Sequence, residues 1–130
     1  MSADRAALLR GAFERTSRGD IDDLVALCCD DVEWNEQMLP DQKVYRGHAG
    51  VRQWFRDVTQ AFTWGTIELI DFEESGDRGV TEVVVSTTGV ESGVAVRATV
   101  FHAIRFRGDK IAEITALLDR DDARRAAGLG

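Results

Sequence analysis

The stretch Val94–Asp119, VAVRATVFHAIRFRGDKIAEITALLD, contains two long apolar-rich runs separated by Gly108 and Asp109. A glycine-containing dipeptide between two such runs is the local signal for a two-residue turn, because glycine readily adopts the positive φ that these turns require. The stretch therefore predicts two long antiparallel strands joined by a tight turn. The rest of the chain is expected to pack around this hairpin.

The turn fixes which residues of the two strands lie opposite one another. With Arg107 opposite Lys110, the predicted pairs are Phe106 with Ile111, Ile104 with Glu113, His102 with Thr115, Val100 with Leu117 and Ala98 with Asp119. These ten side chains would share one face. That face is mostly apolar, yet it includes three titratable groups that a solid core would not accept unpaired, namely His102, Glu113 and Asp119. We therefore interpret this face as the lining of a cavity.

Length and composition indicate one globular domain spanning residues 1–130. Of the 130 residues, 44% are hydrophobic and 30% are charged, which is enough to bury a core without disulfides or a structural metal. No apolar run approaches the roughly 20 residues that would span a bilayer, and the N-terminus lacks a secretory signal pattern. We therefore expect no membrane contact and a cytoplasmic location.

Charge and cysteine content argue against two further classes of partner. The net charge of −7, from 23 acidic and 16 basic residues, opposes binding to a phosphate backbone, so nucleic acid is not expected as a partner. The two cysteines, Cys28 and Cys29, are adjacent and would close a disulfide only with severe strain, so they are expected to be reduced. With two histidines and no second cysteine cluster, a zinc site lacks ligands and no metal is expected.

Three helices are predicted in the first half of the chain. The first covers Asp4–Arg18 and the second is a shorter helix that begins at Asp20. The third opens at Gly47, and its apolar residues recur at spacings of three and four: Val51, Trp54, Phe55, Val58 and Phe62. Between the second and third helices, a short strand at Val32–Asn35 leads into a loop, Glu36–Arg46.

The second half of the chain is typical of strands. Thr66–Glu74 and Val80–Thr88 precede the hairpin, with glycine-containing turns between them. A short terminal helix follows Asp119 and ends at Gly128. Helices followed by consecutive strands indicate an α+β domain, in which a cone-shaped, curved antiparallel sheet packs against the N-terminal helices and leaves space for a ligand between them.

Four motifs, in order, resemble the SnoaL-like proteins of the nuclear transport factor 2-like superfamily. They are Asp31–Trp34 (DVEW), Tyr45–Val51 (YRGHAGV) leading into Trp54 and Phe55, Phe106–Ile111 (FRGDKI) and the terminal Leu118–Leu129. The resemblance spans nearly the full chain. It implies a cone-shaped α+β fold, frequently homodimeric, which hosts polyketide cyclases, ketosteroid isomerases, epoxide hydrolases, dehydratases and pure binding domains.

The resemblance also implies roles for two carboxylates. Asp119, at the end of the last strand and followed by a helix, looks like the acid/base aspartate of the polyketide cyclases. Glu36, at the exit of the first strand, lies where ketosteroid isomerases place their proton-shuttling aspartate. Those isomerases also need a tyrosine in the first helix region, and the first helix of this chain has none.

Each candidate residue has a functional and a structural interpretation. Asp119 is a catalytic acid/base or the N-cap of the terminal helix, and His102 is a general base or a hydrogen-bonded core histidine. Glu36 is a third catalytic candidate or a solvated loop charge, and Glu113 orients His102 or lies in water at the rim. The residues predicted to contact a substrate, or simply to fill the core, are Trp34, Tyr45, Trp54, Phe62, Trp64, Val100, Thr115 and Leu117, whose aromatic members suit stacking on a planar ligand.

These residues favour a cofactor-independent cyclase or isomerase acting on a small, apolar carbonyl compound. Asp119 or His102 would remove a proton α to the carbonyl, and the other groups would stabilise the enolate. The alternatives are a non-catalytic binding domain for a hydrophobic metabolite and a structural dimerisation unit with a filled core. The outer sheet face, which carries Arg97, Arg105 and Arg107 among apolar residues, is expected to form a homodimer contact.

Overall fold

A computed structural model describes residues 4–37 and 43–129 of the chain. In chain order the described elements are α1 (Arg5–Ser17), α2 (Asp22–Leu27), β1 (Cys28–Glu36), β2 (Lys43–Arg46), α3 (Gly47–Ala61), β3 (Phe62–Ser75), β4 (Arg78–Gly89), β5 (Ala95–Arg107), β6 (Lys110–Leu117) and α4 (Arg120–Ala127). The strands form one sheet in the order β2-β1-β6-β5-β4-β3. The predicted α+β class is confirmed.

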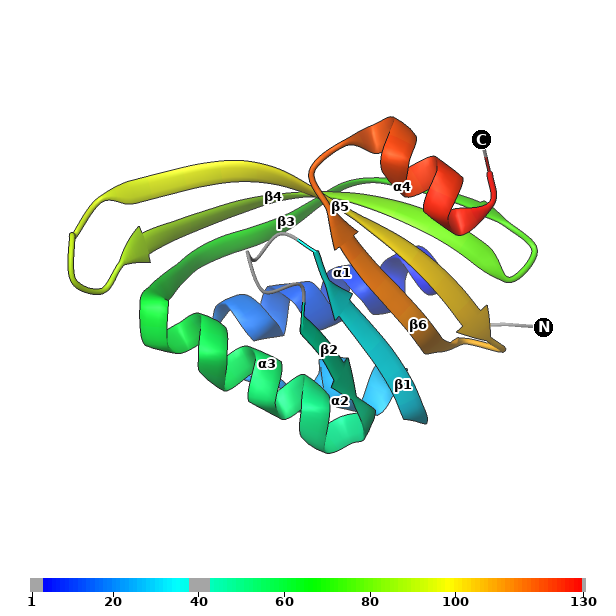
Figure 1. The fold of residues 1–130 in the computed structure, drawn as a ribbon, viewed down its shortest axis with the longest axis horizontal. Helices are drawn as coiled ribbons and strands as arrows, with labels where there is room; N and C mark the ends of the chain where they lie inside the picture. Colours follow the sequence, from blue (N-terminus) through cyan, green and yellow to red (C-terminus); the bar gives the residue numbers. More distant parts are fainter. Residues whose placement is uncertain (1–3, 38–42, 130) are drawn as a thin grey trace.

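The curled sheet has its helices on two sides (Figure 1). On the concave side, α1 packs on β3 and α3 packs on β1, and these helices bury Leu9, Phe13 and Trp54 in the main core. On the convex side, α4 packs over β4, β5 and β6, and its Ala123 and Ala127 form a second, smaller cluster with strand residues. Burial of apolar side chains on both sides therefore fixes the sheet between two helical layers.

The sheet is mixed, whereas the prediction was antiparallel throughout. Neighbouring strands that follow one another in sequence pair antiparallel, but β1 pairs with β6 in a parallel sense. No short turn joins β1 to β6, so nothing local imposes an antiparallel direction on this pair.

The central hairpin forms at the predicted turn. Gly108 has a φ of +64°, and Arg107 lies opposite Lys110 as expected. Beyond the next pair, however, a β-bulge at Ala112 shifts the register. Glu113 therefore pairs with Arg105, whereas the prediction paired it with Ile104. A one-residue shift turns every following side chain of β6 to the other face. The predicted register is therefore right next to the turn and wrong for the rest of β6.

Most other element boundaries differ from prediction by only a few residues. Asp4 caps α1 through its side chain, as the predicted start implied. Cys28 and Cys29 are the first two residues of β1. Both thiols are free, and burial raises the pKa of Cys28 to about 12. The last four residues of the predicted loop Glu36–Arg46 form β2. Residues 38–42 of that loop lie outside the described residues. Phe62, predicted in the third helix, begins β3.

Candidate functional site

A cavity of about 250 Å³ opens between the concave face of the sheet and the helices α1 and α3. Its walls come from six elements and the residue after β6. The lining residues are Phe13, Thr16, Trp34, Glu36, Trp54, Val58, Phe62, Ile67, Val83, Val85, Thr87, Val96, Ala98, Val100, His102 and Leu118. Twelve of these sixteen residues are apolar or aromatic, so the few polar groups in the wall define its chemistry.

The cavity is polar at its buried end and apolar where it opens. Glu36 and His102 are only 3% and 7% exposed. By contrast, Phe62 and Leu118 are 37% and 64% exposed, which places them at the mouth. A ligand entering this cavity would pass apolar surface before it reached the carboxyl and imidazole groups.

Glu36 is held by two tryptophans. It is the last residue of β1, and its Oε2 accepts hydrogen bonds from Nε1 of Trp54 at 3.0 Å and from Nε1 of Trp34 at 3.4 Å. The two indole rings stack on one another with centroids 4.3 Å apart. Because Trp34 and Glu36 are two residues apart on a strand, both side chains point to the concave face. The indole donors fix the position of a carboxyl group inside an apolar cavity.

His102 lies on β5, opposite Thr81 of β4. Its Nδ1 is 3.0 Å from Oγ1 of Thr81. Its ring stacks on Phe13 with centroids 5.6 Å apart, and it makes an edge-to-face contact with Trp34 with centroids 6.2 Å apart. Burial lowers the pKa of His102 from 6.5 to about 4, because the charged imidazolium would lose its water. The imidazole is therefore neutral at physiological pH and is oriented on three sides by the protein.

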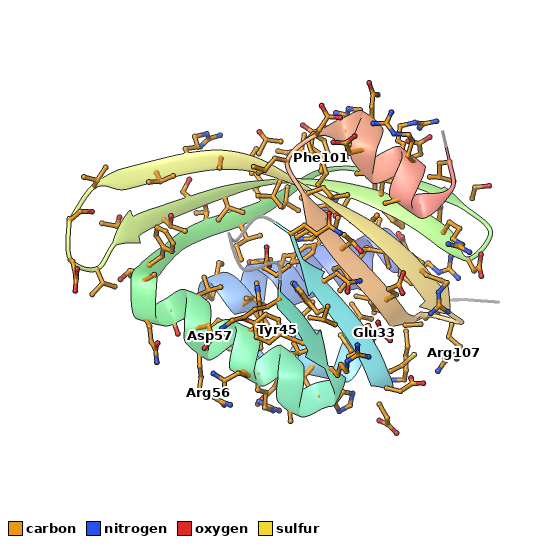
Figure 2. All side chains as sticks on the ribbon, viewed as in Figure 1. Glu33, Tyr45, Arg56, Asp57, Phe101 and Arg107 are labelled. Carbon is orange, nitrogen blue, oxygen red and sulfur yellow. The ribbon has the colours of Figure 1, made fainter. Side chains whose placement is uncertain are left out.

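Three residues predicted in the cavity lie on the convex face instead. The bulge at Ala112 turns Glu113, Thr115 and Leu117 outward, where they pair with Arg105, Ala103 and Phe101 respectively. Leu117 packs against the α4 cluster, and Phe101 lies near the start of α4 (Figure 2). The prediction placed them inside because it assumed an unbroken alternation from the turn.

Asp119 caps α4 and is exposed to solvent. Its side chain accepts a hydrogen bond from the backbone N–H of Asp122 at 3.0 Å. The predicted pairing of Asp119 with Ala98 is wrong, because β6 ends at Leu117, which pairs with Phe101. Of the two interpretations of Asp119, the N-cap describes where its side chain lies.

Tyr45 is bonded to α3 and is not among the residues that line the described cavity. It lies on β2, and its hydroxyl donates a 2.7 Å hydrogen bond to Oδ2 of Asp57, beside it in Figure 2. This bond, with a second from Gln53, lowers the pKa of Asp57. Tyr45 therefore joins β2 to α3, and its phenol group supports the fold rather than the cavity wall.

The remaining predicted contacts divide between the cavity and the undescribed part of the chain. Val100 and Phe62 lie in the cavity wall. Trp64 pairs with Thr87 through its backbone, but its side chain lies outside what the structure describes.

The sequence reasoning missed the contribution of β4. Thr81, Val83, Val85 and Thr87 recur at every second position, and all four face the concave side in register with β5. This period of two is the signal that would have identified them as one face of a strand. Phe13 and Thr16 of α1 were missed because the spacing of apolar residues shows which face of a helix is buried. It does not show which residues of that face border a cavity.

Two features that would indicate other classes of site are absent from the part of the chain that the structure describes. Within residues 4–37 and 43–129, no group of three or more His, Cys, Asp or Glu side chains is arranged to hold a metal ion. None of the helices described has both the length and the apolar content that crossing a bilayer requires.

Known structures share the architecture of this chain. A protein from Burkholderia pseudomallei described as NTF2-like and of unknown function is 22% identical, with a TM-score of 0.78 over 96% of this chain and 98% of that one. TerC, crystallised with polyporic acid, is 19% identical, with a TM-score of 0.77 over 95% and 96%. A protein from Mesorhizobium loti, provisionally described as a SnoaL-like polyketide cyclase, is 17% identical, with a TM-score of 0.70 over 88% and 99%.

These likenesses establish the fold, because their sequence identities are too low to carry an activity across. A search of curated proteins gave no match. A family model for the SnoaL-like domain, in contrast, matches residues 9–114, which include β1, α3 and the hairpin turn. The chain therefore belongs to the SnoaL-like domain family.

Proposed function

We propose that this protein is a cofactor-independent acid–base enzyme of the cyclase or isomerase type, acting on a small apolar carbonyl compound. The observation that carries the proposal is a buried carboxyl group, Glu36, placed by two indole N–H groups at the closed end of an apolar cavity that also contains a neutral imidazole. A positioned carboxylate and a hydrogen-bonding group are the minimum that enolisation requires.

In this mechanism the Glu36 carboxylate removes a proton from the carbon α to the carbonyl, and the C–H electron pair becomes that of the enolate. His102 stabilises the developing charge on the carbonyl oxygen. For an isomerase, the protonated Glu36 returns its proton to another carbon. For a cyclase, the enolate carbon attacks a second carbonyl, a C–C bond forms as the C=O π bond breaks, and the new alkoxide takes the proton that Glu36 holds, which restores the Glu36 carboxylate. The apolar walls strengthen these interactions by excluding water.

Proton exchange at the α-carbon tests the proposal whatever the final product is. Aromatic ketones are first screened by thermal shift, and those that stabilise the protein are incubated with it in D₂O while NMR follows loss of the α-proton. We expect Glu36→Gln to lower the exchange rate about a hundredfold or more. The matched control is Glu33→Gln on the same strand, because Glu33 lies on the convex face and pairs with Arg46.

Three outcomes would change the assignment. Stabilisation by ketones without any exchange would support the alternative, a non-catalytic binding domain for a hydrophobic metabolite. Equal rates for wild type and Glu36→Gln would remove Glu36 as the base. Asp119→Ser keeps a capping side chain on α4, so a loss of exchange confined to this variant would move the base to Asp119.

We also propose that the protein works in the cytoplasm as a homodimer formed through the convex sheet face, with a small hydrophobic molecule as its ligand. The exposed face around Arg97 and Thr99 supplies the contact surface left uncovered by α4. Sedimentation velocity at micromolar concentration should give a dimer, and Arg97→Glu should weaken it. A monomer at all concentrations would contradict this.

A further inference from the structure

Thr81 and His102 form a buried pair, of which His102 lies in the cavity wall. They are directly opposite one another on β4 and β5, so their side chains leave the sheet on the same face. Thr81 is completely buried and His102 nearly so. The 3.0 Å contact between Thr81 Oγ1 and His102 Nδ1 is therefore made out of reach of bulk water.

The position of the protons in this pair follows from the groups available. A neutral imidazole has one N–H and one acceptor nitrogen, and a threonine hydroxyl has one proton to donate. Among the described residues, the Nδ1 atom of His102 is the acceptor within reach of the Thr81 hydroxyl. If Nδ1 carried the proton, the hydroxyl proton would be buried without an acceptor, which costs about 1–3 kcal/mol.

We propose that Thr81 is a positioning residue that donates to Nδ1 of His102 and so fixes the proton on Nε2, making His102 a hydrogen-bond donor toward the cavity. The Nε2 atom makes no hydrogen bond to the part of the chain that the structure describes, and it lies at the end of the ring away from the backbone. This N–H is then available to bind an oxygen of a ligand.

The arrangement gives the cavity a defined polarity. His102 supplies a donor, and the Glu36 carboxyl supplies acceptor oxygens held in place by Trp34 and Trp54. This inference rests on the proposed function in assigning the ligand: a carbonyl oxygen binds at His102 and the acidic C–H faces Glu36. The opposite tautomer would present an acceptor at both ends and would favour a ligand with two donors.

The tautomer is measured directly on ligand-free protein. In a long-range ¹H–¹⁵N correlation spectrum at pH 7, His102 should show Nε2 with the shift of a protonated nitrogen and Nδ1 with that of an unprotonated one. His48→Gln identifies which of the two histidine patterns belongs to His102. Protonated Nδ1 in the wild-type protein would overturn the proposal.

Two variants test whether Thr81 is the cause. Thr81→Ser keeps the hydroxyl and should keep the Nε2–H tautomer, whereas Thr81→Val keeps the shape without the hydroxyl and should populate the Nδ1–H form. An unchanged tautomer in folded Thr81→Val would overturn the role of Thr81. If Thr81→Val does not fold, the wild-type and Thr81→Ser spectra still decide where the proton lies.

Turnover supplies an independent readout. With a ketone that exchanges its α-proton, Thr81→Val should lower kcat about tenfold with little change in KM, and Thr81→Ser should restore most of it. If no ketone exchanges but the spectrum shows Nε2–H, the proposed function fails and the tautomer assignment stands. If exchange occurs while Nδ1 carries the proton, the tautomer assignment fails and the function stands.

Discussion

The concave and convex faces of the same sheet accommodate polar side chains in opposite ways. On the concave face, Glu36 and His102 are buried, and each is hydrogen-bonded by a neighbouring side chain. On the convex side, Glu33 of β1 and Arg120 at the start of α4 remain exposed to water and form ion pairs. A buried polar group that loses its partner has no water to replace it. The face on which a residue lies, more than its type, therefore determines how much the fold and the site depend on it.

The sharpest way to break this comparison is to exchange two neighbouring side chains of β6. In the double variant Glu113→Ile with Ile114→Glu, a carboxylate would replace Ile114, which is fully buried in the main core, and an apolar side chain would take the convex position opposite Arg105. We expect a loss of more than about 4 kcal/mol in unfolding free energy, or no folding, measured by circular dichroism and urea titration. Glu113→Ile alone leaves the concave face unchanged and should cost about 1 kcal/mol or less. A double variant as stable as wild type would show that the two faces accept a charge equally well.

The next largest effect is the dependence of stability on pH through His102. The folded pKa of about 4 lies below the unfolded value of 6.5, so the unfolded chain takes up a proton first as the pH falls. Above pH 6.5 His102 has no effect on the pH dependence. Between pH 6.5 and 4 it should destabilise the fold progressively, by about 3 kcal/mol in total.

Urea unfolding at several pH values checks this, with His102→Asn as the comparison, because asparagine does not titrate. Between pH 6.5 and 4, the unfolding free energy of the variant should fall less than that of the wild-type protein. Identical slopes for the two proteins would mean that the folded imidazole is not desolvated.

Two glutamates on β1 offer a smaller, matched test. Glu36→Ala removes the acceptor of two indole N–H groups, and we expect it to cost about 2 kcal/mol. Glu33→Ala removes an exposed ion pair with Arg46 and should cost less than about 1 kcal/mol. Thermal unfolding of both variants measures the difference, and equal losses would contradict the distinction between the two faces.

The smallest effect is expected for Arg120 on the convex face. Its guanidinium pairs with Glu82 and Asp71 and lies 5.1 Å from the ring centroid of Phe101. Because this side chain is 46% exposed, Arg120→Ala should cost about 1 kcal/mol or less, and the cost should shrink in high salt. A loss larger than that of Glu36→Ala would reverse the ranking of the two faces.

The sequence predicted the fold well because its signals are local and repeated. The spacing of Val51 and Trp54 belongs to a helix, and the Gly108 turn belongs to a hairpin, whatever the rest of the chain does. The parallel pairing of β1 with β6 had no such signal, because it joins segments from opposite ends of the domain.

The site was predicted less evenly, and one residue explains much of the difference. The predicted set included Glu36, His102 and Trp34, which the structure places in the cavity wall. Glu113 was assigned from its distance to the turn, and nothing in Lys110–Leu117 marks Ala112 as an extra residue. A bulge is stabilised by the packing of both faces at once, so it becomes visible only when the layers on both sides are known.

The parallel pairing of β1 with β6 has a consequence for biosynthesis. Asn35 of β1 and Thr115 of β6 are hydrogen-bonded although 80 residues separate them. As the nascent chain leaves the ribosome, one edge of β1 stays uncovered until β6 has also emerged, and closing so long a loop slows folding. Shortened forms that end before β6 would carry Glu36 on a strand without its inner neighbour, and such forms are expected to aggregate through that edge.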